Sequence, residues 1–121
     1  MLYIEIAETP SELETGLMFR KKLSFDAGML FKLGYPQRAT FWGKNTFIPL
    51  DIAFIKDDGT ISKIDKIDPF DRKPVTSSDK CNMVLEVNAG YFSANDIDVG
   101  DTITFDKYEN YDIILFDKHE G

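Results

Sequence analysis

The stretch Leu50–Ile67, LDIAFIKDDGTISKIDKI, decides the fold class. Its first half is apolar and rich in the residues that favour strands, and Asp57-Asp58-Gly59 is typical of a hairpin turn. Thr60–Ile67 then returns with an isoleucine at every third position. We therefore expect a strand over Leu50–Lys56, a tight turn, and an antiparallel partner strand over Thr60–Ile67.

Segments on both sides of this hairpin also have the pattern of short strands. We expect them at Leu2–Ala7, Ala27–Leu33, Ala39–Trp42, Asn82–Val87, Thr102–Phe105 and Asp112–Phe116. Strands that follow one another without intervening helices favour antiparallel sheets. The sequence therefore predicts a mainly β fold with minor α, a compact antiparallel β-sandwich or barrel-like domain.

One N-terminal helix is expected after the first strand. Thr9-Pro10-Ser11-Glu12 combines a capping Thr, a Pro suited to the first helical turn, and the Glu of a capping box. The helix should run to about Arg20, with Gly16 inside it at a close approach to the sheet. Residues 88–95 predict a turn or short second helix, and residues 68–80 a long loop.

The chain has 121 residues and a net charge of −7, which fits a single domain over residues 1–121. Residues 95–121 alone carry a net charge of −6. Because an acidic surface repels phosphates, we expect no nucleic-acid partner. This acidic C-terminal face serves either solubility or the docking of a basic partner.

The chain has a single cysteine, Cys81, and a single histidine, His119. An internal disulfide and zinc sites built from Cys and His are therefore excluded. Asp96, Asp98 and Asp101 lack the spacing of a helix–loop–helix calcium site. We expect no metal and no cofactor, a half-buried free thiol at Cys81, and an inert, disordered tail at His119.

The N-terminus carries Glu5 and has neither a basic start nor a long apolar run, so we expect no signal peptide. No stretch approaches the roughly 18 apolar residues that cross a bilayer. Because its one cysteine cannot form an internal disulfide, we expect a soluble protein of the cytoplasm that does not associate with membranes. We also expect it to be a monomer or a weak dimer.

Six motifs occur in an order that resembles the Domain of Unknown Function 192 family. The motifs are Gly16–Arg20, Gly28–Phe31, Phe41–Thr46, Ile48–Asp51, Leu85–Gly90 and Val99–Asp101. The resemblance covers about residues 3–106 and leaves the last strand and the acidic tail, residues 107–121, outside it. It implies a compact, mainly β fold with a helix near the N-terminus, and it implies no reaction.

Two features depart from the family's pattern. Family members usually have Met where this chain has Gly43, so the loop before Lys44 is either looser or approached more closely by another group. Many relatives also carry an export leader. The chain therefore resembles the intracellular or phage-borne members of the family. This resemblance implies a cytoplasmic location, which for a phage-encoded protein is the cytoplasm of the host cell.

Polar residues of three of these motifs, together with an aromatic one, form the candidate ligand-binding site: Trp42, Lys44, Asn45, Thr46, Asp51, Glu86 and Asn88. In a pocket, Lys44 would supply a positive charge, the asparagines paired donors and acceptors, and Trp42 a stacking wall. The alternative is structural. Asn45 and Thr46 would bond the backbone of an irregular loop, Asp51 would pair with Lys44, and Glu86 would cap or pair inside the fold.

Three functions remain open at this stage. The first is a non-enzymatic binding or accessory protein that holds a protein or a small polar ligand through the Trp42–Asp51 loop and the Glu86–Asn88 edge. The second is a hydrolase or carbohydrate-active enzyme that uses Asp51 and Glu86 as an acid–base pair, although no catalytic nucleophile is evident. The third is an accessory or inhibitory protein that acts through the acidic C-terminal face.

Overall fold

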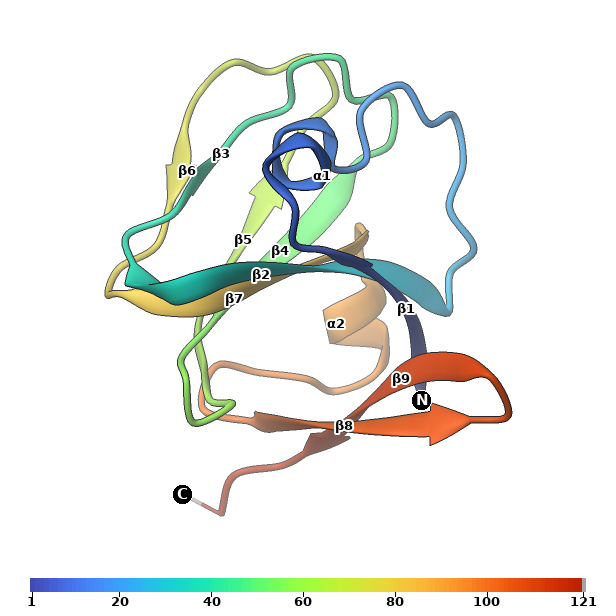
Figure 1. Cartoon of the computed structure of the whole chain (residues 1–121), viewed down its shortest axis with the longest axis vertical. Helices are drawn as coiled ribbons and strands as arrows, with labels where there is room; N and C mark the ends of the chain where they lie inside the picture. Colours follow the sequence, from blue (N-terminus) through green and yellow to red (C-terminus); the bar gives the residue numbers. More distant parts are fainter. Residues whose placement is uncertain (121) are drawn as a thin grey trace.

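Seven strands form one strongly curved sheet in the computed structural model, which describes residues 1–120 (Figure 1). Their order across the sheet is β5-β4-β7-β2-β1-β9-β8. The strands are β1 Leu2–Ala7, β2 Ala27–Gln37, β4 Leu50–Ile55, β5 Ile61–Ile67, β7 Cys81–Asn88, β8 Thr102–Tyr108 and β9 Tyr111–Asp117. The expected hairpin is confirmed as β4 and β5, which pair antiparallel.

The sheet curls until its two end strands meet at one corner. Thr60, just before β5, forms an isolated antiparallel bridge with Thr102 of β8. The Ile61 N–H donates to the Asp101 carbonyl at 2.9 Å, and the Ile103 N–H donates to the Gly59 carbonyl at 2.9 Å. The mainly β, barrel-like prediction is therefore confirmed as a half-barrel closed at this corner.

One pair of strands departs from the antiparallel pattern. β1 and β2 run parallel, with Tyr3 opposite Ala27 and Ala7 opposite Phe31. The crossover between them contains helix α1, Pro10–Thr15, which is the connection that a parallel pair requires. The capping box predicted at Thr9 and Glu12 is present.

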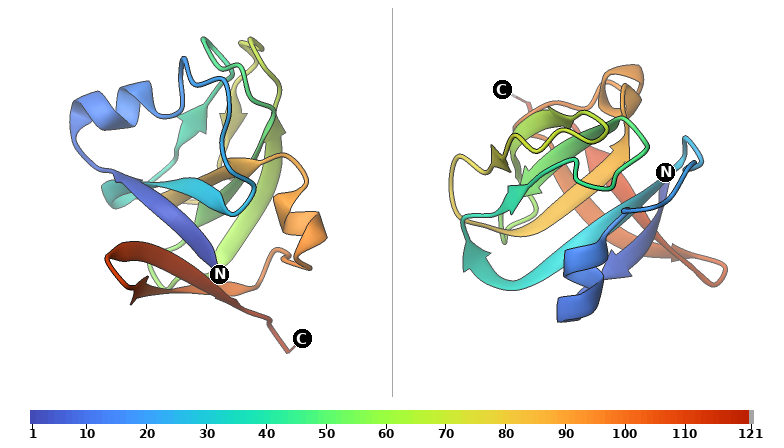
Figure 2. Two further views of the ribbon diagram at one scale, coloured as in Figure 1. Left: turned by 90° about the vertical axis from the view of Figure 1, so that its right-hand side faces the viewer. Right: turned by 90° about the horizontal axis from the view of Figure 1, so that it is seen from above.

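The sheet separates two apolar cores. One core lies inside the curl with β8, β9 and helix α2, Tyr91–Ala94, and includes Leu85, Val87 and Phe92. The other lies on the opposite face, where α1 and a small ribbon of β3, Thr40–Phe41, and β6, Val75–Thr76, cover it. Figures 1 and 2 show α1 and the β3–β6 ribbon on one side of β2 and β7, while α2 and the far end of the curled sheet, β8 and β9, lie on the other side.

Helix α1 is shorter than the sequence suggested. It ends at Thr15 rather than near Arg20, because Gly16 takes φ 48° and ψ −129°, a conformation that does not continue a helix. A Cβ on Gly16 would lie 3.0 Å from the Phe31 ring. The close approach to the sheet was therefore correct, but Gly16 ends the helix instead of lying inside it.

Three other expectations need correction. β2 does not end at Leu33 but continues through Gly34-Tyr35-Pro36 to Gln37. Its pairing with β7 breaks after Lys32 and resumes at Gln37, so Pro36, which lacks an N–H, lies where no hydrogen bond to β7 is needed. The long loop contains β6. Cys81 is fully buried rather than half-buried, and burial raises the pKa of its thiol.

The C-terminal tail is held against the barrel corner rather than disordered. The buried Asp101 carboxylate accepts hydrogen bonds from the Lys118 ammonium at 2.9 Å and from the His119 N–H at 3.0 Å. It also accepts one from the Asp98 N–H at 2.8 Å, so Asp101 closes the turn at Gly100. Across residues 1–120, no helix has the length and apolar character needed to cross a bilayer.

Candidate functional site

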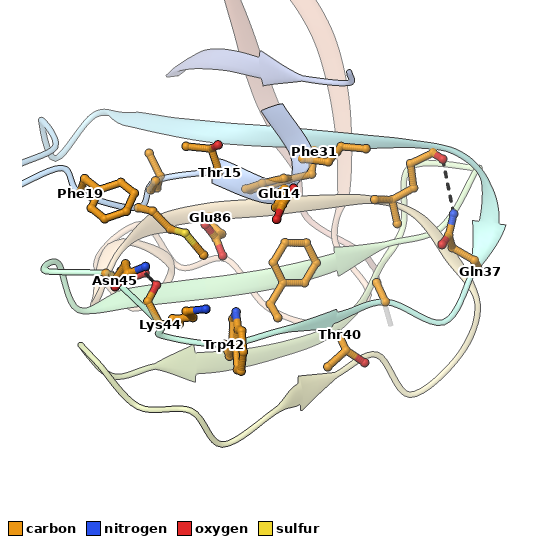
Figure 3. Close-up of a pocket in the computed structure, with 18 of the residues that line it drawn as sticks. Glu14, Thr15, Phe19, Phe31, Gln37, Thr40, Trp42, Lys44, Asn45 and Glu86 are labelled. Carbon is orange, nitrogen blue, oxygen red and sulfur yellow. Dashed lines mark hydrogen bonds between the residues drawn. The ribbon is translucent and has the colours of Figure 1, made fainter. Parts of the chain in front are cut away.

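A cavity of about 590 Å³ opens between α1 and the segment 38–46, on the sheet face that carries the second core. It is bounded by the end of α1, by β2, by the 38–46 segment and by one side chain of β7 (Figure 3). Its size lies within the range of small-molecule sites. The residues that line it are Leu13–Phe19, Phe31, Leu33, Gln37–Trp42, Lys44–Thr46 and Glu86.

Glu86 is the buried ionisable group of this cavity. It lies on β7 between Met29 of β2 and Ile52 of β4, and its residue is only 5% exposed. Within residues 1–120, no hydrogen bond or ion pair reaches its carboxyl group, which points into the cavity in Figure 3. Burial raises its pKa to about 8, so the group is largely protonated and neutral at pH 7.

Lys44 and Trp42 lie at the mouth of the cavity. The Lys44 ammonium is 5.4 Å from the centre of the Trp42 ring, within the range of a cation–π contact. Trp42 is 43% exposed, so its ring is available to a ligand. Asp51 was expected to pair with Lys44 in the structural alternative, but the described residues show no ion pair between them.

Asn45 and Thr46 line the same cavity but also build its wall. Asn45 has φ 55°, and its carbonyl accepts the Phe19 N–H at 2.8 Å. The Thr46 hydroxyl donates to the Lys44 carbonyl at 3.2 Å, and its N–H donates to the Gly43 carbonyl at 3.1 Å. The Thr46 hydroxyl therefore has the loop-building role that the structural alternative described, whereas Asn45 takes part through its backbone.

Asp51 and Asn88 do not line the cavity. In the β4–β7 register Asp51 lies opposite Val87 and Ile52 opposite Glu86, so the two carboxyl groups project from opposite faces of the sheet. Asp51 Oδ2 accepts the Gly90 N–H at 2.9 Å, while Oδ1 is buried without a partner among residues 1–120. The Asn88 amide donates to the Leu23 carbonyl at 2.7 Å and ties down the loop before β2.

Comparison with known proteins assigns the chain to a family. The model of the Domain of Unknown Function 192 family, described as an uncharacterised group, matches residues 1–105. The chain belongs to this family. A comparison with curated proteins finds no match.

Two solved structures are similar to this member of the Domain of Unknown Function 192 family. One is a proposed transcription regulator from Sinorhizobium meliloti 1021, with 39% identity, a TM-score of 0.82, and coverage of 84% of this chain and 79% of the other. The second is a protein of unknown function from Novosphingobium aromaticivorans DSM 12444, with 39% identity, a TM-score of 0.79, and coverage of 82% and 71%.

The structure gives a reason for the glycine at position 43. The Gly43 N–H donates to the Asp71 carbonyl at 2.6 Å, and the Gly43 carbonyl accepts the Phe70 N–H at 2.9 Å. A Cβ on Gly43 would overlap the Asp68 carbonyl oxygen. Of the two consequences expected for Gly43, the structure therefore has the close approach, and the approaching group is the chain's own 68–71 segment.

Several cavity residues of this family member were not identified from the sequence. Glu14 and Thr15 come from α1, Gln37 from β2, and Arg38 and Thr40 from the segment that follows. Nothing in the local sequence distinguishes them from ordinary surface residues, because only the packing of α1 over the sheet brings them to the site. In residues 1–120, no three His, Cys, Asp or Glu side chains gather as a metal site.

Proposed function

We propose that the protein binds a small polar molecule in the cavity between α1 and the 38–46 segment. The observation that carries this proposal is Glu86, a carboxyl group buried at the base of an open cavity without any partner in the described residues. A buried polar group without a hydrogen bond costs stability. A bound ligand that meets this group would recover that cost.

The mouth of the cavity supports recognition of a polar ligand. Lys44 supplies a positive charge, Trp42 an exposed ring, and Glu14 a negative charge on the opposite wall. Buried apolar surface below these groups, from Phe31 and Leu17, supplies affinity. This combination of an apolar base and a few polar groups is typical of ligand pockets.

Binding is a better account than hydrolysis. The proposed pair of Asp51 and Glu86 has no shared space, since the sheet lies between the two carboxyl groups. Glu14 brings a second carboxyl group to the cavity, but it is exposed, and no hydrogen bond among residues 1–120 orients it. A paired-carboxylate mechanism requires two groups that are held in position.

The acidic C-terminal face is a weaker candidate. Lys118 lies within 4.0 Å of carboxylate oxygens of Asp96, Asp98 and Asp101, so part of this negative charge is neutralised within the chain.

The relative named as a proposed regulator suggests a sensing role. With a net charge of −7, we expect such a role to pass through a protein partner rather than direct contact with nucleic acid.

A thermal-shift screen against a broad set of small polar metabolites tests the proposal. We expect at least one compound to stabilise the wild type, by about 2.7 kcal/mol at one hundred times its dissociation constant. Glu86→Gln should reduce this effect, and Lys44→Ala should change it in the direction set by the charge of the ligand. Lys56→Ala and Glu109→Gln are matched controls, because both side chains are exposed and lie outside the cavity.

Two results would contradict the proposal. One is the absence of any stabilisation of the wild type over the whole set. The other is stabilisation that persists unchanged in both cavity variants, which would place the binding site elsewhere on the molecule.

A further inference from the structure

The base of the cavity is apolar except for Glu86. Phe31, Leu17 and Ala39 are buried around it, and Met29 and Ile52 flank it on the neighbouring strands. The buried Thr46 hydroxyl is already used by the Lys44 carbonyl. A ligand that reaches the base therefore meets one ionisable group inside an apolar enclosure.

The charged groups that line the cavity leave Glu86 unpaired. Lys44 and Arg38 come from the 38–46 segment, and Glu14 comes from α1. Lys44 lies over the Trp42 ring, and the Arg38 guanidinium donates to the Ser78 carbonyl at 2.7 Å. The neighbouring strands contribute only neutral side chains at this site, Gln37 and Met29 from β2 and Ile52 from β4.

We propose that the ligand is a primary amine with a compact apolar body, whose ammonium group pairs with the Glu86 carboxylate. This inference rests on the proposed binding function. An ammonium group donates charge-assisted hydrogen bonds to a carboxylate, and these are stronger in an apolar enclosure than in water. The rings of Phe31 and Phe41, whose centres are 5.0 Å apart, add apolar surface to this enclosure.

Binding of an amine requires that Glu86 loses its proton. Burial raises the Glu86 pKa to about 8, so near neutral pH the carboxyl proton passes to solvent when the ammonium arrives. No bond of the ligand forms or breaks. We therefore expect about one proton released per amine bound near pH 7, and an affinity that rises about tenfold for each pH unit up to about 8.

Calorimetry with matched probes tests the inference. The first three probes are benzylamine, benzyl alcohol and benzoate. A second set carries the same three groups, an amine, an alcohol and a carboxylate, on a butyl chain. At pH 8 the wild type should bind each amine at least about tenfold more tightly than its alcohol, which corresponds to one charge-assisted contact. Titrations of the wild type with each amine near pH 7, in buffers of different ionisation enthalpy, measure the number of protons released. We expect about one proton per amine bound.

Two variants locate the effect. Glu86→Gln keeps the size of the side chain and should remove the preference for the amine and the proton release, while binding of the alcohol persists. Lys44→Ala removes a like charge from the mouth of the cavity, so it should leave amine affinity unchanged or raise it. If Glu86→Gln fails to fold, proton release by the wild type still decides the question.

The outcomes separate the ligand class from the binding function. Tighter binding of the alcohols or carboxylates, or amine binding without proton release, overturns the amine class and leaves the cavity as a binding site. If metabolites bind but no amine probe binds, the amine class is likewise overturned and the cavity remains a binding site. If neither metabolites nor probes bind, both proposals fail.

Discussion

Glu86 and Asp51 lie on neighbouring strands but project from opposite faces of the sheet. Glu86 stands opposite Ile52 and Asp51 stands opposite Val87 in the β4–β7 register. Because side chains alternate along a strand, this one-residue offset sends one carboxyl group into the cavity and the other toward the core inside the curl. The two acids therefore have separate roles, which can be tested one at a time.

Asp51 should affect stability and not ligand binding. Its Oδ2 accepts the Gly90 N–H at the start of α2, so Asp51→Ala leaves that donor without its partner. We expect a loss of about 1–3 kcal/mol in the free energy of unfolding, measured by urea denaturation. Ligand affinity, measured per folded molecule, should stay unchanged. A variant of full stability that fails to bind would show that Asp51 belongs to the site.

Glu86 should make the protein less stable as pH rises. Its pKa is about 8 in the folded state against an ordinary value of 4.5, so between these values the folded state holds a proton that the unfolded state has released. The free energy of unfolding of the wild type should fall relative to Glu86→Gln, by up to about 1.4 kcal/mol per pH unit. Urea denaturation at pH 5, 6.5 and 8 measures this difference. Parallel curves for the two proteins would contradict the buried, unpartnered state.

The class of fold was readable from the sequence because its signals are local. The Asp57-Asp58-Gly59 turn and the Thr9–Glu12 capping box depend on nearby residues, and both appear where expected. The end of α1 was missed because it depends on the backbone conformation that Gly16 adopts where it lies close to Phe31, a residue from a distant part of the chain. The parallel pairing of β1 and β2 likewise depends on tertiary structure.

The candidate site was predictable only in part. Trp42, Lys44, Asn45, Thr46 and Glu86 line one cavity, as the grouping of motifs suggested. Asp51 and Asn88 do not, because whether a strand residue faces the cavity depends on pairing register. The contribution of α1 could not be read from the sequence, because its short polar turn has no pattern that indicates a site.

Gly43 should be intolerant of any side chain. A Cβ there would overlap the Asp68 carbonyl oxygen and would crowd the backbone of Asp71. Because these neighbouring atoms belong to the backbone, they cannot move cheaply. We expect Gly43→Ala to lower the free energy of unfolding by about 1–3 kcal/mol or more, measured by urea denaturation. Gly34→Ala is the matched control, because nothing lies within 4 Å of the added Cβ. Its cost should be limited to about 1–2 kcal/mol of backbone strain at φ 89°.

A clear result at Gly43 would be a larger loss than at Gly34. Equal losses in the two variants would mean that the 68–71 segment can move away from Gly43 at little cost, which would contradict this prediction.

Asp101 should stabilise the C-terminal tail in its ionised form. Burial alone would raise its pKa, but hydrogen bonds from the Asp98 and His119 N–H groups and from Lys118 lower the pKa to about 2. Its stabilising effect should be full above about pH 4 and should disappear as pH falls toward 2. Asp101→Asn should cost about 1.5–3 kcal/mol at pH 7 and much less at pH 2.5, measured by urea denaturation.

Asp96→Asn is the matched control for this prediction. The Asp96 carboxylate lies 4.0 Å from the same Lys118 ammonium but is 88% exposed, so its loss should be within about 1 kcal/mol. An equal effect of the two substitutions at pH 7 would contradict the special role of Asp101.

The most direct test of the proposed site is the pKa of Glu86 itself. Titration of the side-chain carboxyl carbons by carbon-13 NMR, with Glu86→Gln to assign the signal, measures it without any ligand. A midpoint near 8 is expected for a carboxyl group that is buried at the base of the cavity without a partner. A midpoint near 4.5 would mean that the group is solvated or paired, and the ligand site built around it would be contradicted.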